Sequence, residues 1–308
     1  MRNFKCLIFK CLMAASLLLL PSTVFLQSPQ PDGAGLKAGV LPDRWTPAGP
    51  DCAKIPPFQL HEYNDDLFIL RESGCTNYEK PFMFLIFGKD KVLLLDTGAG
   101  KAEVAKAVKD AIDKWRSRNK RDSIDLVVAH THAHGDHIAG DSQFKDAPKT
   151  TLVLPNLQAV ETFFGIKNWP EEIVTYDLGN RVLNIIPIPG HEATSIAVYD
   201  RQTGILFTGD SLYPGRLYVR QPTEYVQSIQ RLVDFTQNKP IAHIIGNHIE
   251  NTRTPFLDYK VGTVYQPDEH VLELGRGQLL ELNDALRQMN GSIVRRAFRD
   301  FTIWPNIR

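Results

Sequence analysis

The sequence predicts a mixed α/β protein in which helices and sheets form separate layers. Short runs of aliphatic and aromatic residues, typical of buried strands, alternate along the chain with stretches that have apolar residues at helical spacing. No second Pro/Gly-rich break follows residue 57, which favours one large domain over two. The chain has 308 residues, 43% of them hydrophobic, and can therefore bury a sizeable core.

The first segment, residues 1–28, has the pattern of a secretory signal peptide. Arg2, Lys5 and Lys10 form a positive start, and the apolar residues 11–20 follow. This apolar run is shorter than the roughly 18–20 residues that a membrane span needs. We therefore expect a periplasmic or secreted protein. An uncleaved membrane anchor is the alternative, because no clear cleavage site follows the run.

Residues 29–57 form the second segment, which contains seven prolines and four glycines. This composition is typical of an extended linker or of an arm wrapped on the domain, and the domain itself is expected at residues 58–308. Cys52 and Cys75 are the cysteines left once the first segment is removed. An oxidising compartment would allow them to form a disulfide, which we state as a hypothesis.

Within the domain, apolar alternation and spacing place the elements in order. Residues 101–118 illustrate the helical pattern, since Val104, Val108, Ile112 and Trp115 fall on one face. The other expected helices are 157–164, 224–236 and 278–289. Strands are expected at 60–63, 67–71, 82–87, 92–95, 124–129, 151–154, 173–176, 182–188, 195–199, 205–208 and 241–245.

A histidine-rich stretch follows the strand expected at 124–129. It reads His130-Thr-His-Ala-His-Gly-Asp-His137 and holds four of the nine histidines of the chain. Neutral imidazoles together with a carboxylate are the ligands that zinc prefers. The pattern predicts a metal site at the end of this strand, and a metal-free surface loop is the alternative.

Three further strands end in a possible ligand. They are followed by His191, Asp210 and His248, each of which comes one or two residues after a glycine. Glycine allows the backbone to turn sharply and to approach a metal closely. A single His or Asp after a strand is more often a turn residue. Three such positions, in a chain that already has the histidine loop, favour one shared metal site.

These motifs resemble the metallo-β-lactamase superfamily over about residues 58–250. The resemblance implies a four-layer αββα sandwich. It also implies that His132, His134 and His191 hold one metal ion, that Asp136, His137 and His248 hold a second, and that Asp210 bridges the two. The matching pieces are residues 95–98 (Leu-Asp-Thr-Gly), the loop 132–137, Gly190-His191, Thr208-Gly-Asp210 and His248.

A site of this kind implies metal-dependent hydrolysis with two divalent ions, Zn²⁺ as the first choice and Fe or Mn as alternatives. Two ions that share a water lower its pKa, so hydroxide is available at neutral pH to attack a carbonyl or phosphoryl centre. Asp136 is the expected catalytic residue, because it can orient the nucleophile and later protonate the leaving group. Asp96 either braces the histidine loop or is a plain turn residue. His130 and His243 are expected to be structural or to support the ligands, and not to bind metal themselves.

Asp210 directs the choice of reaction. True metallo-β-lactamases carry cysteine or serine at the equivalent position, whereas thiolester, phosphoester and lactone hydrolases of the superfamily carry aspartate. Residues 208–213 look most like the glyoxalase II group, although Gly246-Asn-His248 departs from its Gly-His-Gly and no glutathione-binding helical domain is recognisable. We expect an exported hydrolase of a small-molecule ester, thiolester, lactone or phosphoester. A β-lactamase and an inactive metal-binding or interaction protein are the alternatives.

The remaining expectations concern partners and the pocket. Lys and Arg together number 35, as do Asp and Glu, so the charge does not suggest a nucleic-acid partner. Arg216 or Arg220 would suit an anionic substrate group, with a surface salt bridge as the alternative. The expected pocket-lining residues are Phe163, Phe164 and Trp169 on a possible lid, and Tyr213, Arg216, Tyr218 and Arg220 after the bridging aspartate.

Overall fold

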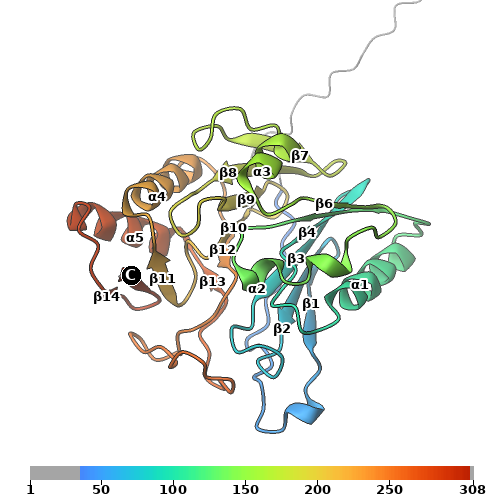
Figure 1. Ribbon diagram of the computed structural model, residues 1–308, viewed down its shortest axis with the longest axis horizontal. Coiled ribbons are helices and arrows are strands. Elements are labelled where there is room, and N and C mark those ends of the chain that lie inside the picture. Colours follow the sequence, from blue (N-terminus) through green and yellow to red (C-terminus); the bar gives the residue numbers. More distant parts are fainter. Residues whose placement is uncertain (1–34, 306–308) are drawn as a thin grey trace, which may run out of the picture. The chain divides into compact units, whose positions relative to one another are not determined.

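The computed structural model describes residues 35–305, so the segment assigned as a signal peptide lies outside the described residues (Figure 1). Residues 35–57 contain one short 3₁₀ helix, η1 (Cys52–Lys54), and are otherwise without regular secondary structure. Trp45 of this arm is buried, and its ring centroid lies 4.8 Å from that of Phe82. The predicted disulfide between Cys52 and Cys75 is present, with the two Cα atoms 5.4 Å apart. Within residues 35–305, no helix has the length and apolar character that a membrane crossing requires.

Two six-stranded sheets form the centre of the domain. Sheet A contains β1 (Phe58–Asn64), β2 (Leu67–Glu72), β3 (Phe82–Phe87), β4 (Lys91–Leu95), β5 (Asp125–Ala129) and β6 (Thr150–Leu152). Its strands follow the order of the chain, with antiparallel pairing up to β4 and parallel pairing from β4 to β6.

Sheet B contains, in spatial order, β13 (Glu273–Leu274), β12 (His243–Gly246), β10 (Ile205–Gly209), β9 (Ile196–Asp200), β8 (Val182–Pro187) and β7 (Val174–Asp177). Strands β8, β10 and β12 run in the same direction, because β9 is antiparallel to β8 and β10 while β12 is parallel to β10.

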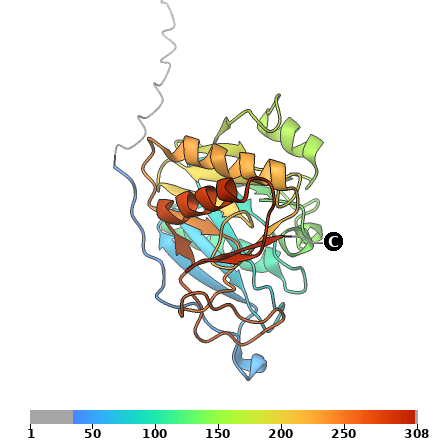
Figure 2. The same cartoon turned by 90° about the vertical axis from the view of Figure 1, so that its left-hand side faces the viewer.

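The long helices lie on the outer faces of the two sheets (Figures 1 and 2). Helix α1 (Val104–Arg118) covers the outer face of sheet A, whereas α4 (Pro222–Thr236) and α5 (Arg276–Met289) cover the outer face of sheet B. The shorter helices are α2 (Gly135–Ile138), η2 (Asp141–Gln143) and α3 (Leu157–Phe164). A small third sheet consists of β11 (Arg216–Val219), β15 (Thr302–Pro305) and β14 (Arg296–Ala297).

Three hydrophobic clusters fill the three spaces between these layers, and strand β3 shows why. Successive side chains of a strand point to opposite faces. Phe84 packs between the sheets, with its ring centroid 4.6 Å from that of Phe207, whereas its neighbour Leu85 packs with α1. On the far side of sheet B, Leu206 packs with the helices α4 and α5. The layers are therefore α, β, β and α, which confirms the predicted sandwich.

Some element boundaries differ from the sequence-based expectations. Helix α1 begins at Val104 instead of residue 101, and α4 begins at Pro222, where the fixed φ of proline suits the first turn of a helix. Strands β11, β13, β14 and β15 were not expected. Each has only two to four residues, too few to show a periodicity that would identify it. Strands β11, β13 and β15 pair with segments distant in the chain, whereas β14 pairs with the nearby β15.

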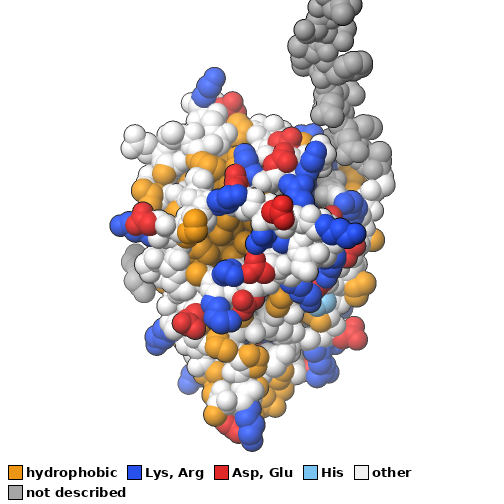
Figure 3. All heavy atoms as spheres, turned by 90° about the vertical axis from the view of Figure 1, so that its right-hand side faces the viewer, with side chains coloured by type: hydrophobic (Ala, Val, Ile, Leu, Met, Phe, Trp, Pro, Cys, Tyr) orange, Lys and Arg blue, Asp and Glu red, His pale blue; other side chains and the backbone are white. Residues whose placement is uncertain are grey.

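The face that carries α1 has mixed charge (Figure 3). Along this helix Lys106 lies 2.6 Å from Asp110, and Lys109 lies 2.5 Å from Asp113, so neighbouring charges are paired at i,i+4 spacing. Lys and Arg side chains alternate with Asp and Glu over this face instead of gathering into a patch of one sign. This face therefore offers no continuous basic surface of the kind that binds nucleic acid.

Candidate metal centre

The structure brings all seven predicted ligands together at one edge of the sandwich. The loop after β5 supplies His132, His134, Asp136 and His137, and the last three lie at or within the short helix α2. The other three follow the ends of β8, β10 and β12. Because these three strands run in the same direction, their carboxyl ends meet at the same edge of sheet B.

The first group of ligand atoms contains three imidazole nitrogens and one carboxylate oxygen. His134 Nδ1 lies 2.8 Å from His132 Nε2 and 3.0 Å from His191 Nε2. Asp210 Oδ2 lies 3.8 Å from His132 Nε2 and 3.6 Å from His191 Nε2. These atoms face one another, and all lie close enough to share one ion.

The second group contains two imidazole nitrogens and two carboxylates. His248 Nε2 lies 3.1 Å from Asp136 Oδ2, 3.4 Å from Asp210 Oδ1 and 3.4 Å from His137 Nε2. His137 Nε2 lies 3.3 Å from Asp136 Oδ2 and 3.5 Å from Asp210 Oδ2. Asp210 therefore belongs to both groups.

The spacing and chemistry of both groups fit a divalent ion such as zinc. Four ligands at about 2.0–2.1 Å from a tetrahedral zinc lie about 3.3 Å from one another. The distances given above, 2.8–3.8 Å, bracket that value. Asp210 Oδ1 is also buried without a hydrogen-bond donor, and a bound cation would satisfy such an oxygen.

The protein fixes the orientation of three of these imidazoles through their second ring nitrogen. His191 Nδ1 lies 3.0 Å from the carbonyl oxygen of Tyr218, and His248 Nδ1 lies 2.9 Å from that of Glu79. His137 Nδ1 lies 3.1 Å from Asp96 Oδ2. Each Nδ1 donates its hydrogen to an acceptor, so the lone pair on Nε2 points into the site, as metal binding requires.

Asp96 braces the histidine loop and is not a plain turn residue. Its carboxylate accepts hydrogen bonds from the amide and the hydroxyl of Thr131, both at 2.7 Å, and from Asn247 Nδ2 at 2.6 Å. It also accepts the hydrogen of His137 Nδ1. Because Asn247 precedes His248, this one buried carboxylate connects the histidine loop of sheet A with the end of β12 in sheet B.

The histidines of the first group are held neutral. Burial, followed by the nearby His137, keeps the pKa of His132 well below its usual value. Burial lowers the pKa of His191 to about 4, and burial and then Arg220 lower the pKa of His134. Neutral imidazole is the form that binds a metal.

The second group attracts positive charge. Burial by itself would lower the pKa of His137 and His248, but Asp136 and Asp210 outweigh it and raise both pKa values well above the usual one. Burial would raise the pKa of Asp210 and Asp136, but the two histidines hold both pKa values below the ordinary range. Both carboxylates are therefore ionised and available to a cation.

Glycines before the ligands are required by close contacts. Gly190 has a φ of +136°, and a Cβ there would lie 2.4 Å from the backbone of Tyr225 in α4. A Cβ at Gly246 would lie 2.5 Å from Cβ of Tyr213. Any side chain at either position would displace the backbone that carries His191 or His248.

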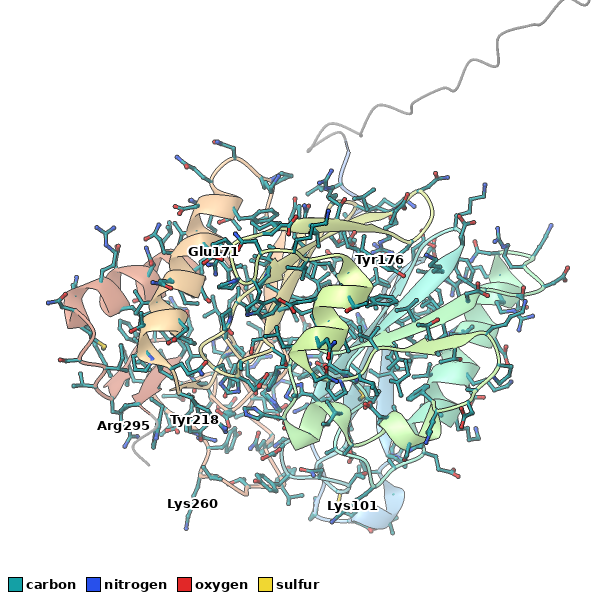
Figure 4. All side chains as sticks on the ribbon, turned by 45° about the horizontal axis from the view of Figure 1, so that its top comes forward. Lys101, Glu171, Tyr176, Tyr218, Lys260 and Arg295 are labelled. Atoms are coloured by element: carbon teal, nitrogen blue, oxygen red, sulfur yellow. A yellow bond between two sulfur atoms is a disulfide. The ribbon has the colours of Figure 1, made fainter. Side chains whose placement is uncertain are left out.

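The site opens into a pocket of about 550 Å³. Ligand residues that line it include His134, Asp136 and His248. Tyr213, Arg216, Tyr218 and Arg220 line it as predicted, and Figure 4 shows Tyr218 and Lys260, another lining residue, on the same side of the molecule. Residues 78–80 and 260–262 also contribute to the wall.

The two candidate arginines differ in availability. Arg216 is buried and paired, with Nη2 at 2.6 Å from Glu250 Oε1 and Nη1 at 2.7 Å from Asp258 Oδ2. Arg216 therefore forms salt bridges, which was the alternative to binding an anionic substrate group. These salt bridges lie in the interior and not on the surface. Arg220 is exposed, and its guanidinium has no hydrogen-bond or ion-pair partner among residues 35–305. Arg220 is thus the arginine that can bind an anion.

The prediction that Phe163, Phe164 and Trp169 form a lid over the pocket is wrong. Phe164 is 7% exposed and belongs to the core between the sheets, and the other two pack against that core. The reason is the helical spacing within α3, which places Val160 and Phe164 on one buried face. None of the three lines the pocket described above.

Sequence reasoning missed the loop at residues 73–81. The carbonyl of Glu79 in this loop holds His248, and because every residue type has a backbone carbonyl, no sequence signal marks this contact. Asn247 was also missed as a functional residue, although its place next to His248 was a possible signal. Of the other four histidines, His61, His130, His243 and His270, none belongs to either ligand group.

Comparisons with known proteins agree with this fold. The sequence profile of the Metallo-beta-lactamase superfamily matches residues 79–248, more than half of the chain. The chain is 24% identical over 219 residues to an acyl-coenzyme A thioesterase, MBLAC2 of Bos taurus, a match that covers 60% of this chain and 78% of that protein. It is 30% identical over 126 residues to a hydroxyacylglutathione hydrolase of Nostoc punctiforme, covering 38% of this chain and about half (49%) of that relative. The solved structure of TMB-1 covers 77% of this chain and 100% of its own, with a TM-score of 0.50 and 14% identity, a likeness that shows the fold alone.

The αββα layers, with two His/Asp groups at the strand ends, define a class of hydrolases. The chain belongs to the metallo-β-lactamase superfamily and is a hydrolase of that superfamily.

Proposed function

We propose that this protein is an exported, dinuclear metal-dependent hydrolase that acts on thioesters, with Zn²⁺ as the first choice of ion and Fe or Mn as alternatives. The observation that carries the dinuclear part is the position of Asp210. Its two oxygens lie within 3.4–3.8 Å of ligand nitrogens from both groups. A single carboxylate at such a place suits a bridge between two ions.

The residues that would hold the ions also suggest the reaction. Divalent ions in these two groups would make water nucleophilic at neutral pH and polarise the carbonyl of a substrate. Asp136 faces the pocket and is ionised, so it accepts a hydrogen bond from the attacking water and orients it. The water oxygen bonds to the acyl carbon, the carbon–sulfur bond breaks, and Asp136 passes the proton of the water to the departing sulfur.

The preference for thioesters rests on two supports. The relatives reported above are named for acyl-coenzyme A and hydroxyacylglutathione, in both of which an acyl group is attached to the sulfur of an anionic carrier. Arg220 lines the pocket with a free guanidinium, which would attract such a carrier. Ester, lactone and phosphoester bonds remain within the chemistry of the same site, and a β-lactam is the competing substrate class.

Export is proposed from the first segment of the chain. Residues 1–28 have the composition of a signal peptide. The disulfide between Cys52 and Cys75 supports an oxidising compartment, since such bonds rarely persist in the cytosol. Cell fractionation with the full chain tests this, and accumulation of the intact chain in the cytosol would contradict it.

A substrate panel tests the reaction. Protein loaded with Zn²⁺ is assayed against acetyl-coenzyme A, S-lactoylglutathione, nitrocefin, a γ-lactone and bis(p-nitrophenyl) phosphate, and its metal content is measured alongside. We expect two ions per chain and hydrolysis of thioesters ahead of the other substrates. Rapid nitrocefin hydrolysis with intact thioesters would establish the β-lactamase alternative. Full metal occupancy without hydrolysis of any substrate would establish the inactive alternative.

A further inference from the structure

The segment 252–266, called here the 252–266 loop, exposes an unusual number of apolar side chains. Eleven large hydrophobic residues of the described chain are exposed, and five of them lie in this loop. They are Phe256 (65% exposed), Leu257 (52%), Val261 (58%), Val264 (37%) and Tyr265 (46%). Apolar side chains that cluster on a surface commonly mark a binding site.

The loop is held in place near its C-terminal end, so its apolar side chains are held at the surface. Glu269, just beyond the loop, is buried and accepts a hydrogen bond from Arg71 of β2 at 2.7 Å. Lys80 Nζ lies 3.3 Å from the carbonyl oxygen of Thr263 and 3.7 Å from Glu269. A Cβ at Gly74 would lie 2.8 Å from the carbonyl oxygen of Val264, so the loop packs closely on residues 73–81.

The loop also forms part of the pocket wall. Lys260, Val261, Gly262 and Gln266 line the pocket that contains Asp136 and His248. Tyr78, which is 44% exposed, lines the same pocket, and the carbonyl of its neighbour Glu79 holds His248. We call Tyr78 and Val261 the apolar rim. The rim is thus connected to the second ligand group through the segment that orients His248.

The residues that border the first ligand group have a different character. The carbonyl of Tyr218 holds His191, and two residues later Arg220 presents its free guanidinium. Arg220 therefore lies on the side of the first group, whereas the apolar rim, with Lys80 and Lys260 beside it, lies on the side of the second. This asymmetry matches a molecule that has an anionic part on one side of the scissile bond and an apolar part on the other.

We propose that the apolar rim binds the hydrocarbon part of the acyl group of the substrate, and that the 252–266 loop sets the preference for acyl length. The inference rests on the proposed thioesterase function and deepens it. Transfer of one methylene from water to an apolar contact improves binding about fourfold. A few methylenes in contact with the rim would therefore favour octanoyl over acetyl thioesters by about tenfold or more.

A double variant, Tyr78→Ala with Val261→Asn, tests the rim, and Leu257→Asn is the matched control. Leu257 is exposed on the same loop but does not line the pocket. The first measurement is the ratio of kcat/KM for octanoyl- and acetyl-coenzyme A. We expect the double variant to lower this ratio by about tenfold, and the control to stay within about twofold of the unmodified protein.

The second measurement is independent of turnover. Binding of the non-hydrolysable thioethers S-octyl- and S-ethyl-coenzyme A is followed by calorimetry, with the same expected change in their affinity ratio. If the unmodified protein hydrolyses or binds both chain lengths equally, the inference is overturned while the thioesterase function stands. If no thioester is hydrolysed but S-octyl-coenzyme A binds more tightly and the double variant loses that preference, the rim is supported and the proposed function fails.

Other occupants of the apolar surface would give different results. In one such outcome the protein is retained on phosphatidylcholine vesicles, Leu257→Asn loses this retention, and neither ratio changes in the double variant. This would mean that the surface binds a lipid and not the acyl group. A dimer that dissociates in Leu257→Asn, again with unchanged ratios in the double variant, would mean that a second copy of the chain covers it. Both outcomes overturn the inference.

Discussion

Replacing Asp210 by Asn would show whether one carboxylate serves two ions. Asparagine keeps the shape of the side chain, which is 8% exposed, but removes its negative charge. That charge lies 3.6 Å from His191 Nε2 in the first group and 3.5 Å from His137 Nε2 in the second. The substitution should therefore weaken both sites and not only one.

The size of the effect follows from the role of the residue. Loss of a group that merely orients a metal ligand typically costs 10–100-fold in metal affinity. Asp210 supplies a ligand atom to each group, so we expect each ion to bind at least about 100-fold more weakly, or about 2.7 kcal/mol. Asp136→Asn is the matched comparison, because Asp136 belongs to the second group alone. It should cost the second ion a similar amount and change the first by less than about threefold.

Zn²⁺ affinity can be measured by competition with a chromogenic chelator, and stoichiometry by elemental analysis after dialysis. Thermal unfolding of the metal-free variants controls for folding. Two tightly bound ions in Asp210→Asn would show that the bridge is misassigned. Equal loss of both ions in Asp136→Asn would show that the division into two groups is wrong.

Two further predictions follow from the charges and the disulfide. In the metal-free protein the raised pKa values of His137 and His248 leave protons on the second group at neutral pH, whereas burial lowers the pKa of His191 to about 4. An ion that enters the second group must displace these protons. Its affinity should therefore fall as the pH is lowered from 8 to 6, while the affinity of the first ion changes little. Calorimetry in two buffers measures the protons released by each ion, and equal numbers for both ions would contradict this prediction. The disulfide joins residues 23 positions apart, so replacing Cys52 and Cys75 by Ser should reduce the free energy of unfolding by about 3 kcal/mol, and an unchanged urea midpoint would contradict this.

The layers of the fold could be predicted because their physical signal is local. Residues 82–87 are all buried, with alternate side chains packing against sheet B and against α1, so the strand appears as a continuous apolar run. Helix α1 has the complementary signal, since Val104, Val108 and Trp115 are buried on one face. Strand β15 has no such signal, because it pairs with β11, which lies more than 80 residues earlier in the chain. Strand β14 has only two residues and pairs with β15.

The lid prediction failed for a related reason. Phe163 and Phe164 are consecutive aromatic residues, and an aromatic pair in an apolar segment suits a lid and a core equally well. The three-dimensional packing decides between them, and here Phe164 and Tyr176 meet at 5.5 Å between ring centroids, away from the pocket.

The sequence by itself determined the kinds of atoms in the site and their places in the chain. The histidine loop, His191, Asp210 and His248 could be identified because each follows an apolar strand, and strand ends are local features. Only the tertiary structure decided that Asp210 faces both groups, that Glu79 orients His248 through its carbonyl, and that Arg220 is free while Arg216 is paired. These facts depend on distances between separate segments of the chain, and the packing of the two sheets sets such distances.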